Sequence, residues 1–543
     1  MTTFNSRPAH RAASGFFPDP SICSTPAGTY LMVNSSFEYF PGIPLFESVD
    51  GIHWQRIGDV MSRPSQFPYD SMGNNQGVYA PTIRWHDGRY YVIVTNVNVG
   101  TLLYTATDPH GAWSEPMAIP DWPGIDPSLF FDEDGTAYIC GTSDGSKEPA
   151  GIYAAGIDIA SGRIRSPRVC LTRGITGSNP EGPHIYTRGG RYYLVWAEGG
   201  TEAGHMENIA RAADPLGPYA PYDGNPMLTN RSTELTLQAI GHADCADFEA
   251  ARSLMVFHGT RNNHDYPAHG WIGREPYAVR FTWQDGWPNL SDQSYDCALL
   301  GSGESLEHQV AWITPGRDED HRFTVSGSAQ GIDREDAGVD ITVVPDGDGF
   351  DLDHGAPFIG TRQTDFDCEF SASFASSRML ERGEYGVVIY ANATHYCTCA
   401  VHVDIESEAD ADCESTGVRG GADASDGDSV SRSQPTVRVQ TRVMNAGLRS
   451  VVASCAVAED TPVTLRVRGD DAGYHFAARV GDPGHDGKEC TTIDLGMVPG
   501  KVLSFANAGG FTGTALGVYA QGKGAPVTLH HVRYRAGADA KAT

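Results

Sequence analysis

The sequence lacks two features that define large protein classes. It has no uninterrupted apolar stretch long enough to span a bilayer, and its amino terminus, MTTFNSRPAHRAAS, has no apolar h-region of the kind found in secretory signals. Patterns with apolar residues at i, i+3, i+4 and i+7 are scarce, whereas short alternating runs of aromatic and β-branched residues are frequent. These features argue against a membrane span and against parallel α/β folds, and they predict an all-β protein.

Basic residues and paired cysteines are also scarce. Lys and Arg number 39 against 68 Asp and Glu, so the net charge is −29, which repels nucleic acid and anionic membrane surfaces. We therefore expect neither nucleic acid nor membrane as a partner, and a neutral ligand instead. The 11 cysteines are an odd number without paired spacing, which favours reduced thiols in a cytoplasmic protein over a disulfide framework.

Turn-forming residues, in contrast, are abundant. Gly (63 residues) and Pro (33) make up about 18% of the 543 residues, against a typical value of roughly 12%. In the first 290 residues one unit recurs, a turn followed by an aromatic-rich strand, as in WHDGRYYVIVT (85–95). Five such units occur, centred on Tyr30, Tyr91, Tyr138, Tyr193 and Leu254. Their spacing of 47 to 61 residues predicts a five-bladed β-propeller over residues 1–300, with an irregular β-sandwich as the alternative.

The repeat stops after about residue 295, which predicts a second domain. Residues 301–340 are expected to form a linker and the start of that domain. Over residues 341–543, alternating strands such as DFDCEFSASF (365–374) predict an antiparallel β-sandwich. Within it, about residues 404–432 are rich in acids, Ala, Gly and Ser, so we expect a solvated, mobile insertion there.

Three acids next to proline are the candidates for chemistry. Asp19 and Asp126 each precede Pro-Ser, in FPDPSI (17–22) and IDPSLFF (125–131), and Glu181 follows proline in SNPEGPHIY (178–186). Proline restricts the backbone and biases the residue before it toward extended geometry, so each acid is expected to be rigidly placed. Two carboxyl groups that flank a glycosidic bond can hydrolyse it, and a third carboxylate can raise the pKa of the acid. Ordinary turn formation is the alternative explanation for each motif.

Several segments around these acids resemble a known family. GFFPDPSI, GVYAPTIRWHDGRYYVIVTN, GIDPSLFFDEDGTAYICG, EGPHIYTRGGRYYLVWAEGGTEAGH, GHADCADF, HGTR and GREP occur in this order. Together they resemble glycoside hydrolase family 43, the five-bladed propeller β-xylosidases and α-L-arabinofuranosidases. The resemblance spans about residues 14–290, and it extends more weakly to the C-terminal sandwich of the xylosidase-like members.

The resemblance implies roles for five residues. Asp19 matches the general base, Glu181 the general acid, and Asp126 the acid that modulates the pKa of its neighbour and orients it. Arg274 in GREP matches an arginine that hydrogen-bonds the sugar in the deepest subsite. His242 in GHAD matches a histidine on the propeller axis, which in several relatives helps to hold a calcium or other ion through water.

The resemblance also implies a reaction. It implies inversion, for which we expect about 6.5–9.5 Å between the carboxyl groups of Asp19 and Glu181. The expected activity is exo-acting release of terminal α-L-arabinofuranose or β-D-xylose from (arabino)xylo-oligosaccharides. No redox or nucleotide cofactor is expected, and a homo-oligomer is left open. An endo-acting arabinanase of the same fold and a propeller that binds sugar without cleaving it are the alternatives.

Aromatic residues near these motifs are candidates for contact with the sugar. Phe16, Phe17 and Tyr79 are expected to stack on it, with blade packing as the alternative for each. Phe511 in GGFTG is expected to reach over the pocket from the second domain and make the enzyme exo-acting, with burial in the sandwich as the alternative. Two departures from the family pattern, GREP in place of G-R-E-T and Tyr79 in place of Trp, leave the shape of the stacking wall open.

Overall fold

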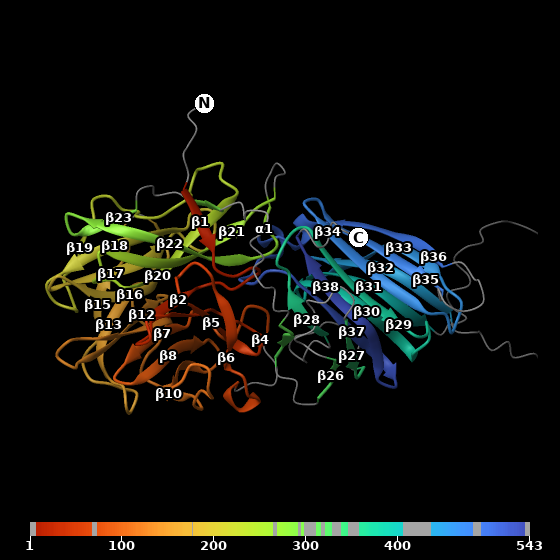
Figure 1. Cartoon of the computed structure of the whole chain (residues 1–543), viewed down its shortest axis with the longest axis horizontal. Helices are drawn as coiled ribbons and strands as arrows, with labels where there is room; N and C mark the ends of the chain where they lie inside the picture. Colours follow the sequence, from red (N-terminus) through yellow and green to blue (C-terminus); the bar gives the residue numbers. More distant parts are fainter. Residues whose placement is uncertain are drawn as a thin grey trace, which may run out of the picture.

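Two β-rich lobes lie side by side in the computed structural model (Figure 1). It describes residues 7–67, 73–175, 177–263, 269–290, 295–297, 311–316, 321–327, 338–345, 358–404, 436–481 and 490–537. The N-terminal lobe is a β-propeller and the C-terminal lobe is a β-sandwich, so the predicted all-β fold class is confirmed. The acidic insertion predicted at about 404–432 lies almost entirely outside the described residues.

Five sheets of four or more strands, antiparallel except for the pair β1 and β24 in the fifth, make up most of the described part of the first lobe. The first is β2 (Ser21–Ser24), β3 (Tyr30–Val33), β5 (Gly42–Ser48) and β6 (Gln55–Met61). The second is β7 (Thr82–His86), β8 (Arg89–Asn96), β9 (Gly100–Ala106) and β10 (Met117–Ile119). The third is β11 (Ile125–Phe131), β12 (Ala137–Ser143), β13 (Gly151–Asp158), β14 (Arg163–Ile164) and β15 (Val169–Thr172). The fourth is β16 (Glu181–Arg188), β17 (Arg191–Glu198), β18 (Met206–Ala212) and β19 (Ala220–Pro221).

The fifth sheet joins the two ends of the propeller sequence. It contains β20 (Leu237–Ala246), β21 (Arg252–Arg261), β22 (Arg274–Gln284), β23 (Trp287–Asn289), β1 (Arg7–Arg11) and β24 (Tyr295–Cys297). β1 pairs with β22 in the register His10 to Ala278. A strand from the start of the chain thus closes the last sheet of the ring.

Tight turns explain why each repeat folds as a hairpin. His86 pairs with Arg89 across Asp87 and Gly88, whose φ values are 45° and 79°. Two residues with positive φ form the type I′ turn, whose twist matches that of the flanking strands. Arg188 and Arg191 enclose Gly189 and Gly190 in the same way.

Apolar layers between neighbouring sheets hold the ring together. One buried cluster joins the first sheet to the second through residues such as Leu31 and Val92, and further clusters join the second to the third, the third to the fourth and the fourth to the fifth. The last packs Ile22 and Met32 of the first sheet on Leu254 and Val256 of the fifth. The ring is therefore closed by side-chain packing as well as by strand pairing.

Two facing sheets form the second lobe. The seven-stranded sheet runs β26 (Phe323–Ser326), β27 (Val339–Val343), β38 (Val527–Ala536), β29 (Cys368–Phe374), β34 (Val463–Asp470), β35 (Gly473–Val480) and β36 (Thr491–Pro499). The six-stranded sheet runs β28 (Phe358–Arg362), β37 (Ala515–Gly524), β30 (Leu380–Asn392), β31 (His395–Asp404), β32 (Thr436–Asn445) and β33 (Leu448–Ala456). Alternate residues of both sheets are buried in one shared core.

Short elements connect the two lobes. β4 (Tyr39–Phe40) of the propeller pairs with β25 (Thr314–Pro315), and η1 (Pro64–Gln66) is a 3-10 turn in the propeller. η4 (Gly500–Leu503) and α1 (Phe505–Ala508) lead into a loop over residues 509–513, which we call the sandwich loop. A buried cluster at the interface combines Phe16 and Tyr39 of the propeller with Phe358, Tyr390 and other residues of the sandwich. The lobes therefore share a packed apolar contact.

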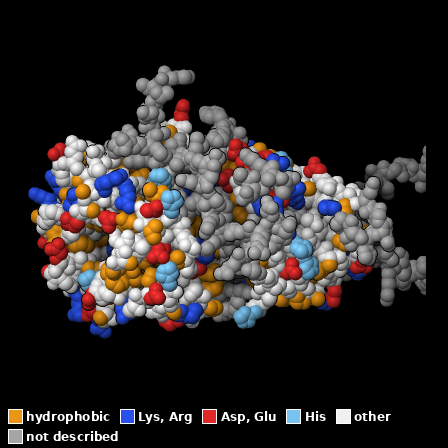
Figure 2. Space-filling view, in the orientation of Figure 1, with side chains coloured by type: hydrophobic (Ala, Val, Ile, Leu, Met, Phe, Trp, Pro, Cys, Tyr) orange, Lys and Arg blue, Asp and Glu red, His pale blue; other side chains and the backbone are white. Residues whose placement is uncertain are grey.

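Charges of both signs are mixed on the face of the molecule seen in Figure 2. Figure 2 shows acidic side chains mixed with Lys and Arg over the propeller lobe. Within the described residues, none of the helices has both the length and the apolar character needed to cross a membrane.

Candidate active site

The three predicted acids all lie at the starts of inner propeller strands. Asp19 precedes β2, Asp126 is the second residue of β11, and Glu181 is the first residue of β16. Asp126 and Asp19 both influence the pKa of Glu181 electrostatically, and the Gly182 N–H donates to Asp126 Oδ2 at 3.0 Å. The structure therefore brings the three acids into one site.

The backbone at two of these acids is not the extended one that the following proline predicts. The φ values of Asp19 and Asp126 are 54° and 51°, in the left-handed region that Asp tolerates better than most residues. In β11 the strand register shifts between Ile125 and Ser128, so a bulge overrides the local preference. The sequence therefore predicted the wrong backbone conformation at both acids, and the bulge supplies the physical reason at Asp126.

Asp19 is a buried carboxylate surrounded by donors. It is 5% exposed, and its Oδ1 accepts from Arg274 Nη1 at 2.6 Å. The hydroxyl of Ser35 donates to its Oδ2 at 2.5 Å, and His242 Nδ1 lies 3.8 Å from Oδ1. Burial alone would raise the pKa of Asp19, but the Arg274 guanidinium and the neighbouring imidazoles hold it well below its usual value. This side chain is therefore a carboxylate at neutral pH, as a general base must be.

His258 supports Asp19 from the fifth sheet. The Asp19 backbone N–H donates to His258 Nδ1 at 3.0 Å, so this nitrogen carries a lone pair. Burial lowers the pKa of His258 to about 3, and the nearby Arg274 charge acts in the same direction. The ring is thus neutral, and its 3.2 Å approach to the carboxylate is not an ion pair. The sequence reasoning missed this residue, although HGTR (258–261) contains it.

Glu181 has the opposite electrostatic setting. Its side chain is 19% exposed, and burial together with the negative charges of Asp126 and Asp19 raises its pKa to about 8. Burial also raises the pKa of Asp126, with a further contribution from Asp19. At neutral pH Glu181 therefore keeps its proton and can donate it, as a general acid must.

Arg274 uses three of its five N–H donors within the protein. Nη1 donates to Asp19 and, at 3.0 Å, to Thr201 Oγ1, and Nη2 donates to the Phe511 carbonyl at 3.0 Å. Its Nε is buried and has no partner in the described part of the chain. Only the second N–H of Nη2 therefore remains for a sugar hydroxyl, because the buried Nε is closed to solvent. Thr201 was not anticipated, although the family-like segment that ends in GGTEAGH contains it.

His242 lies beside the acids but without a set of metal ligands. It is 6% exposed, its φ is 52°, and its ring packs 5.6 Å from that of His258. Within the described residues, no three His, Cys, Asp or Glu side chains gather to hold a metal ion. A role of His242 in holding an ion through water therefore stays a prediction.

One wall of the site is aromatic and comes from both lobes. Phe511 of the sandwich loop stacks on Phe37 with a ring distance of 5.7 Å, and it meets Tyr79 edge-on at 5.8 Å. Phe37 is buried, whereas Tyr79 and Phe511 are partly exposed. The sequence indicated Tyr79 and Phe511 but missed Phe37, which lies in an unremarkable segment.

Phe16 and Phe17 do not belong to that wall. Phe16 is 1% exposed and packs on Tyr39 and Arg362 at the interface between the lobes. Phe17 is 7% exposed and packs edge-on against Phe46. Neither ring offers a face to a sugar, so core packing, the alternative stated for both, describes them.

A buried ion pair lies farther along the inner strands. Arg84 Nη1 donates to Asp244 Oδ2 at 2.7 Å and Nη2 donates to Oδ1 at 3.1 Å, and Ser21 and Tyr186 also donate to this carboxylate. Burial disfavours both charges, but the Arg84 charge lowers the pKa of Asp244 and the Asp244 charge raises the pKa of Arg84, so both groups are ionised. The pair therefore ties the first, second, fourth and fifth sheets together on the axis.

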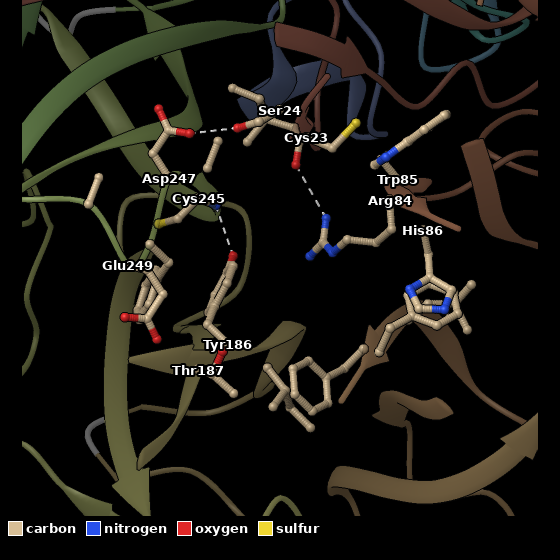
Figure 3. Close-up of a pocket in the computed structure, with 18 residues that line it drawn as sticks. Cys23, Ser24, Arg84, Trp85, His86, Tyr186, Thr187, Cys245, Asp247 and Glu249 are labelled. Atoms are coloured by element: carbon tan, nitrogen blue, oxygen red, sulfur yellow. Dashed lines mark hydrogen bonds between the residues drawn. The ribbon is translucent and has the colours of Figure 1, made fainter. Parts of the chain in front are cut away.

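A cavity of about 550 Å³ opens beyond this ion pair. Figure 3 shows Arg84 and Tyr186 pointing into it, with Trp85, His86 and Asp247 around it. His242 and Asp244 follow one another along β20 and Asp247 comes just after its end, so this cavity lies at the other end of the inner strands from the three acids. The sequence reasoning did not anticipate it.

Comparisons with known proteins match both lobes to described families. The family described as "Glycosyl hydrolases family 43" matches residues 12–288, and "Beta xylosidase C-terminal Concanavalin A-like domain" matches residues 347–535. A "Non-reducing end alpha-L-arabinofuranosidase BoGH43B" from Bacteroides ovatus is 30% identical over 541 residues, which cover 94% of this chain and 90% of the relative.

Two further matches concern the propeller and the whole chain. A "Xylosidase/arabinosidase" from Butyrivibrio fibrisolvens is 38% identical over 288 residues, half of this chain and 54% of the relative. A solved structure titled "Bacteroides ovatus Xyloglucan PUL GH43B" superposes with a TM-score of 0.78 at 28% identity, covering 97% of this chain and all of that one.

Proposed function

This chain belongs to glycosyl hydrolase family 43, and on that premise we propose that it releases terminal α-L-arabinofuranose or β-D-xylose from short (arabino)xylo-oligosaccharides with inversion. It is a glycoside hydrolase that acts from a chain end. One observation carries the assignment of residues: the site holds one carboxyl group whose pKa is depressed and another whose pKa is raised to about 8. Such a pair separates base from acid at neutral pH.

The reaction follows from these protonation states. Asp19 takes a proton from a water molecule whose oxygen attacks the anomeric carbon from the face opposite the leaving group. Glu181 gives its proton to the glycosidic oxygen as the carbon–oxygen bond breaks. Asp126 keeps Glu181 protonated through its charge. Because water must fit between base and sugar, we expect about 6.5–9.5 Å between the carboxyl groups of Asp19 and Glu181.

The contact between the lobes supports action at a chain end. Phe511 packs on Phe37 and Tyr79, and its carbonyl accepts from Arg274. A sandwich loop in this position narrows the propeller pocket on one side, where an endo-acting arabinanase needs an open groove. The remaining Nη2 N–H group of Arg274 would hold a sugar hydroxyl in the deepest subsite.

A cytoplasmic location is part of the proposal. Nine cysteines are free within the described residues. The buried ones include Cys23, Cys140, Cys245, Cys397 and Cys399. Unpaired cysteines suit a reducing compartment.

Paired nitrophenyl glycosides test the proposed function. We expect wild type to release nitrophenol from the α-L-arabinofuranoside, the β-D-xylopyranoside or both. Glu181→Gln should lose at least about a hundredfold in kcat on xylobiose or arabinoxylo-oligosaccharides, because their sugar leaving group needs a proton, whereas nitrophenol leaves without one. Binding of xylobiose by Glu181→Gln, measured by calorimetry, serves as the folding control. Wild type that binds xylobiose and cleaves neither the glycosides nor arabinoxylo-oligosaccharides would show a propeller that only binds sugar.

A further inference from the structure

Arg274 is held in place by both lobes. Its contact with Asp19 lies within the propeller, but Nη2 donates to the carbonyl of Phe511 in the sandwich loop. The loop packs very closely against the propeller, because a Cβ on Gly513 would lie 1.8 Å from the Ile272 carbonyl oxygen. The position of the sandwich loop therefore fixes one side of the guanidinium that faces Asp19.

Asn75 is the propeller residue that holds the sandwich loop. The Phe511 N–H donates to Asn75 Oδ1 at 2.7 Å, so the same residue that accepts from Arg274 through its carbonyl donates to Asn75 through its amide. A Cβ on Gly510 would lie 2.7 Å from Asn75 Oδ1, so only glycine fits beside this side chain. Asn75 has a φ of 58°, a left-handed conformation that asparagine adopts more readily than most residues.

Glu38 in turn holds Asn75. The Asn75 N–H donates to Glu38 Oε2 at 3.3 Å, and the Gly316 N–H donates to the Glu38 carbonyl at 2.7 Å. Glu38 is 1% exposed, and its Oε1 is buried without a partner in the part of the chain that the structure describes. A buried acid with an unused oxygen is costly, which suggests a role other than stability. Burial raises its pKa to about 8, so it is mostly neutral at pH 7.

We propose that Glu38 and Asn75 are positioning residues for the hydrolysis: Glu38 orients Asn75, Asn75 seats the sandwich loop, and the Phe511 carbonyl in that loop orients Arg274 against Asp19. This inference rests on the proposed function, because it assigns these residues to the site of that reaction. It makes the second lobe part of the apparatus that keeps the general base ionised. None of the linking residues needs to touch the sugar.

Substitution at Asn75 tests the link. Asn75→Gly keeps the left-handed backbone accessible but removes the acceptor for the Phe511 N–H, and we expect kcat/KM to fall by about tenfold to about a hundredfold, the cost of a misplaced active-site group. Asn75→Asp keeps an acceptor at the same position and should restore activity to within about threefold of wild type, because only one hydrogen bond changes in kind.

The neighbouring residue provides a matched control. The Asn74 Oδ1 also reaches the sandwich, where it accepts from the Ala393 N–H at 3.4 Å and from the Tyr390 hydroxyl at 3.5 Å, but it has no contact with the sandwich loop among its described bonds. Asn74→Gly should therefore leave kcat/KM within about twofold of wild type, since such long bonds contribute little. If kcat/KM falls equally in the Asn74 and Asn75 variants, the loss comes from weaker packing between the lobes in general, and the proposal is wrong.

The pH profile separates positioning from stability. If the loop releases Arg274, the pKa of Asp19 rises, because the Arg274 charge is the largest influence that holds it down against burial, ahead of His242 and His258. The acid limb of kcat/KM should then move to higher pH in Asn75→Gly and stay in place in Asn75→Asp. An unchanged acid limb in Asn75→Gly would contradict the proposal.

Glu38 and the loop itself give two further readouts. Glu38→Gln keeps an acceptor for the Asn75 N–H and should behave as wild type at pH 7, whereas Glu38→Leu should resemble Asn75→Gly. Deuterium exchange of the peptide that contains Phe511 should be faster in Asn75→Gly than in wild type. This measurement does not need an active enzyme. If wild type cleaves no substrate, the proposed function is wrong, but the link from Glu38 through Asn75 to the sandwich loop can still be tested. If exchange is unchanged in Asn75→Gly, that link is wrong and the proposed function is unaffected.

Discussion

Asp19 and Glu181 differ in protonation because their neighbours differ. Asp19 faces Arg274 and the lone hydroxyl of Ser35, while Glu181 faces two other acids. The same chemical group therefore serves as base or acid according to its surroundings. The sequence identified both acids and Asp126 from their motifs, but not the contacts of His258 and Arg274 with Asp19, because both residues lie more than 200 residues from it.

The role of Asp126 can be tested through the basic limb of the pH profile. Glu181 acts in its protonated form, so kcat/KM should fall as pH rises through its pKa of about 8. Asp126→Asn removes the largest charge that raises this pKa, so the basic limb should move to lower pH. Initial rates measured over about pH 5–10, roughly the range in which such groups titrate, would give kcat/KM against pH and so the position of the basic limb.

A surface acid serves as the comparison for this variant. Asp223 is exposed and lies on the fourth sheet's outer region, so Asp223→Asn should leave both limbs in place. If the basic limb of Asp126→Asn coincides with that of wild type, another group sets it.

At the scale of single strands, bulges aim the functional side chains. Strand register shifts between Ile125 and Ser128 in β11, between Glu181 and His184 in β16, and twice between Gln238 and Asp244 in β20. Bulges commonly lie next to active sites, where they change the direction of a side chain. Asp126 and His242 lie inside such irregular segments, and Glu181 is the paired residue next to one.

This is also where prediction from sequence stopped. Turn motifs such as RGGR located the hairpins correctly, since two glycines favour one turn type. The rule for residues before proline predicted extended geometry at Asp19 and Asp126, whereas tertiary contacts impose left-handed geometry. Phe16 was expected near the sugar because it precedes Asp19 closely, but it faces the second lobe, whose position no local pattern reveals.

Gly182 tests the importance of the bulge in β16. It has a φ of 56°, and a Cβ there would lie 2.9 Å from the His242 ring. Gly182→Ala should cost about 1–2 kcal/mol for the left-handed backbone and about 1–3 kcal/mol for crowding. Urea unfolding would measure the free energy, and kcat should fall as well because the Gly182 N–H holds Asp126.

Gly190 in the same sheet isolates the crowding. Its φ is 70°, but a Cβ there would meet nothing within 4 Å. Gly190→Ala should therefore show only the backbone cost and keep full activity. Similar losses in both variants would mean that contact with His242 is unimportant.

At the scale of the whole molecule, the lobes are joined by a propeller side chain buried in the sandwich. Trp271 is 2% exposed and belongs to the sandwich core cluster, although it precedes β22 of the propeller. Its carbonyl accepts from the Thr514 N–H and hydroxyl, directly after the sandwich loop. Packing between the lobes is thus continuous with the active site.

Trp271→Ala should therefore affect both stability and catalysis. The cavity should cost about 3–5 kcal/mol in the free energy of unfolding. Displacement of the sandwich loop should also raise KM for xylobiose, measured at a temperature where the variant is folded. Trp113→Ala, which removes a tryptophan that is 3% exposed inside the propeller, should lower stability to a similar degree without changing KM.

The closure of the ring by β1 has a consequence for synthesis of the protein. β1 pairs with β22, and Asp19 makes hydrogen bonds with His258 and Arg274. The residues that are synthesised first therefore have no partners until β22 has been synthesised. At roughly 5–20 residues per second, the ribosome delivers these partners tens of seconds or more after Asp19 emerges. In the nascent chain Asp19 therefore lacks its contact with Arg274, and the first sheet lacks the fifth sheet that packs against it. The enzyme cannot become active before its propeller has been translated through β22.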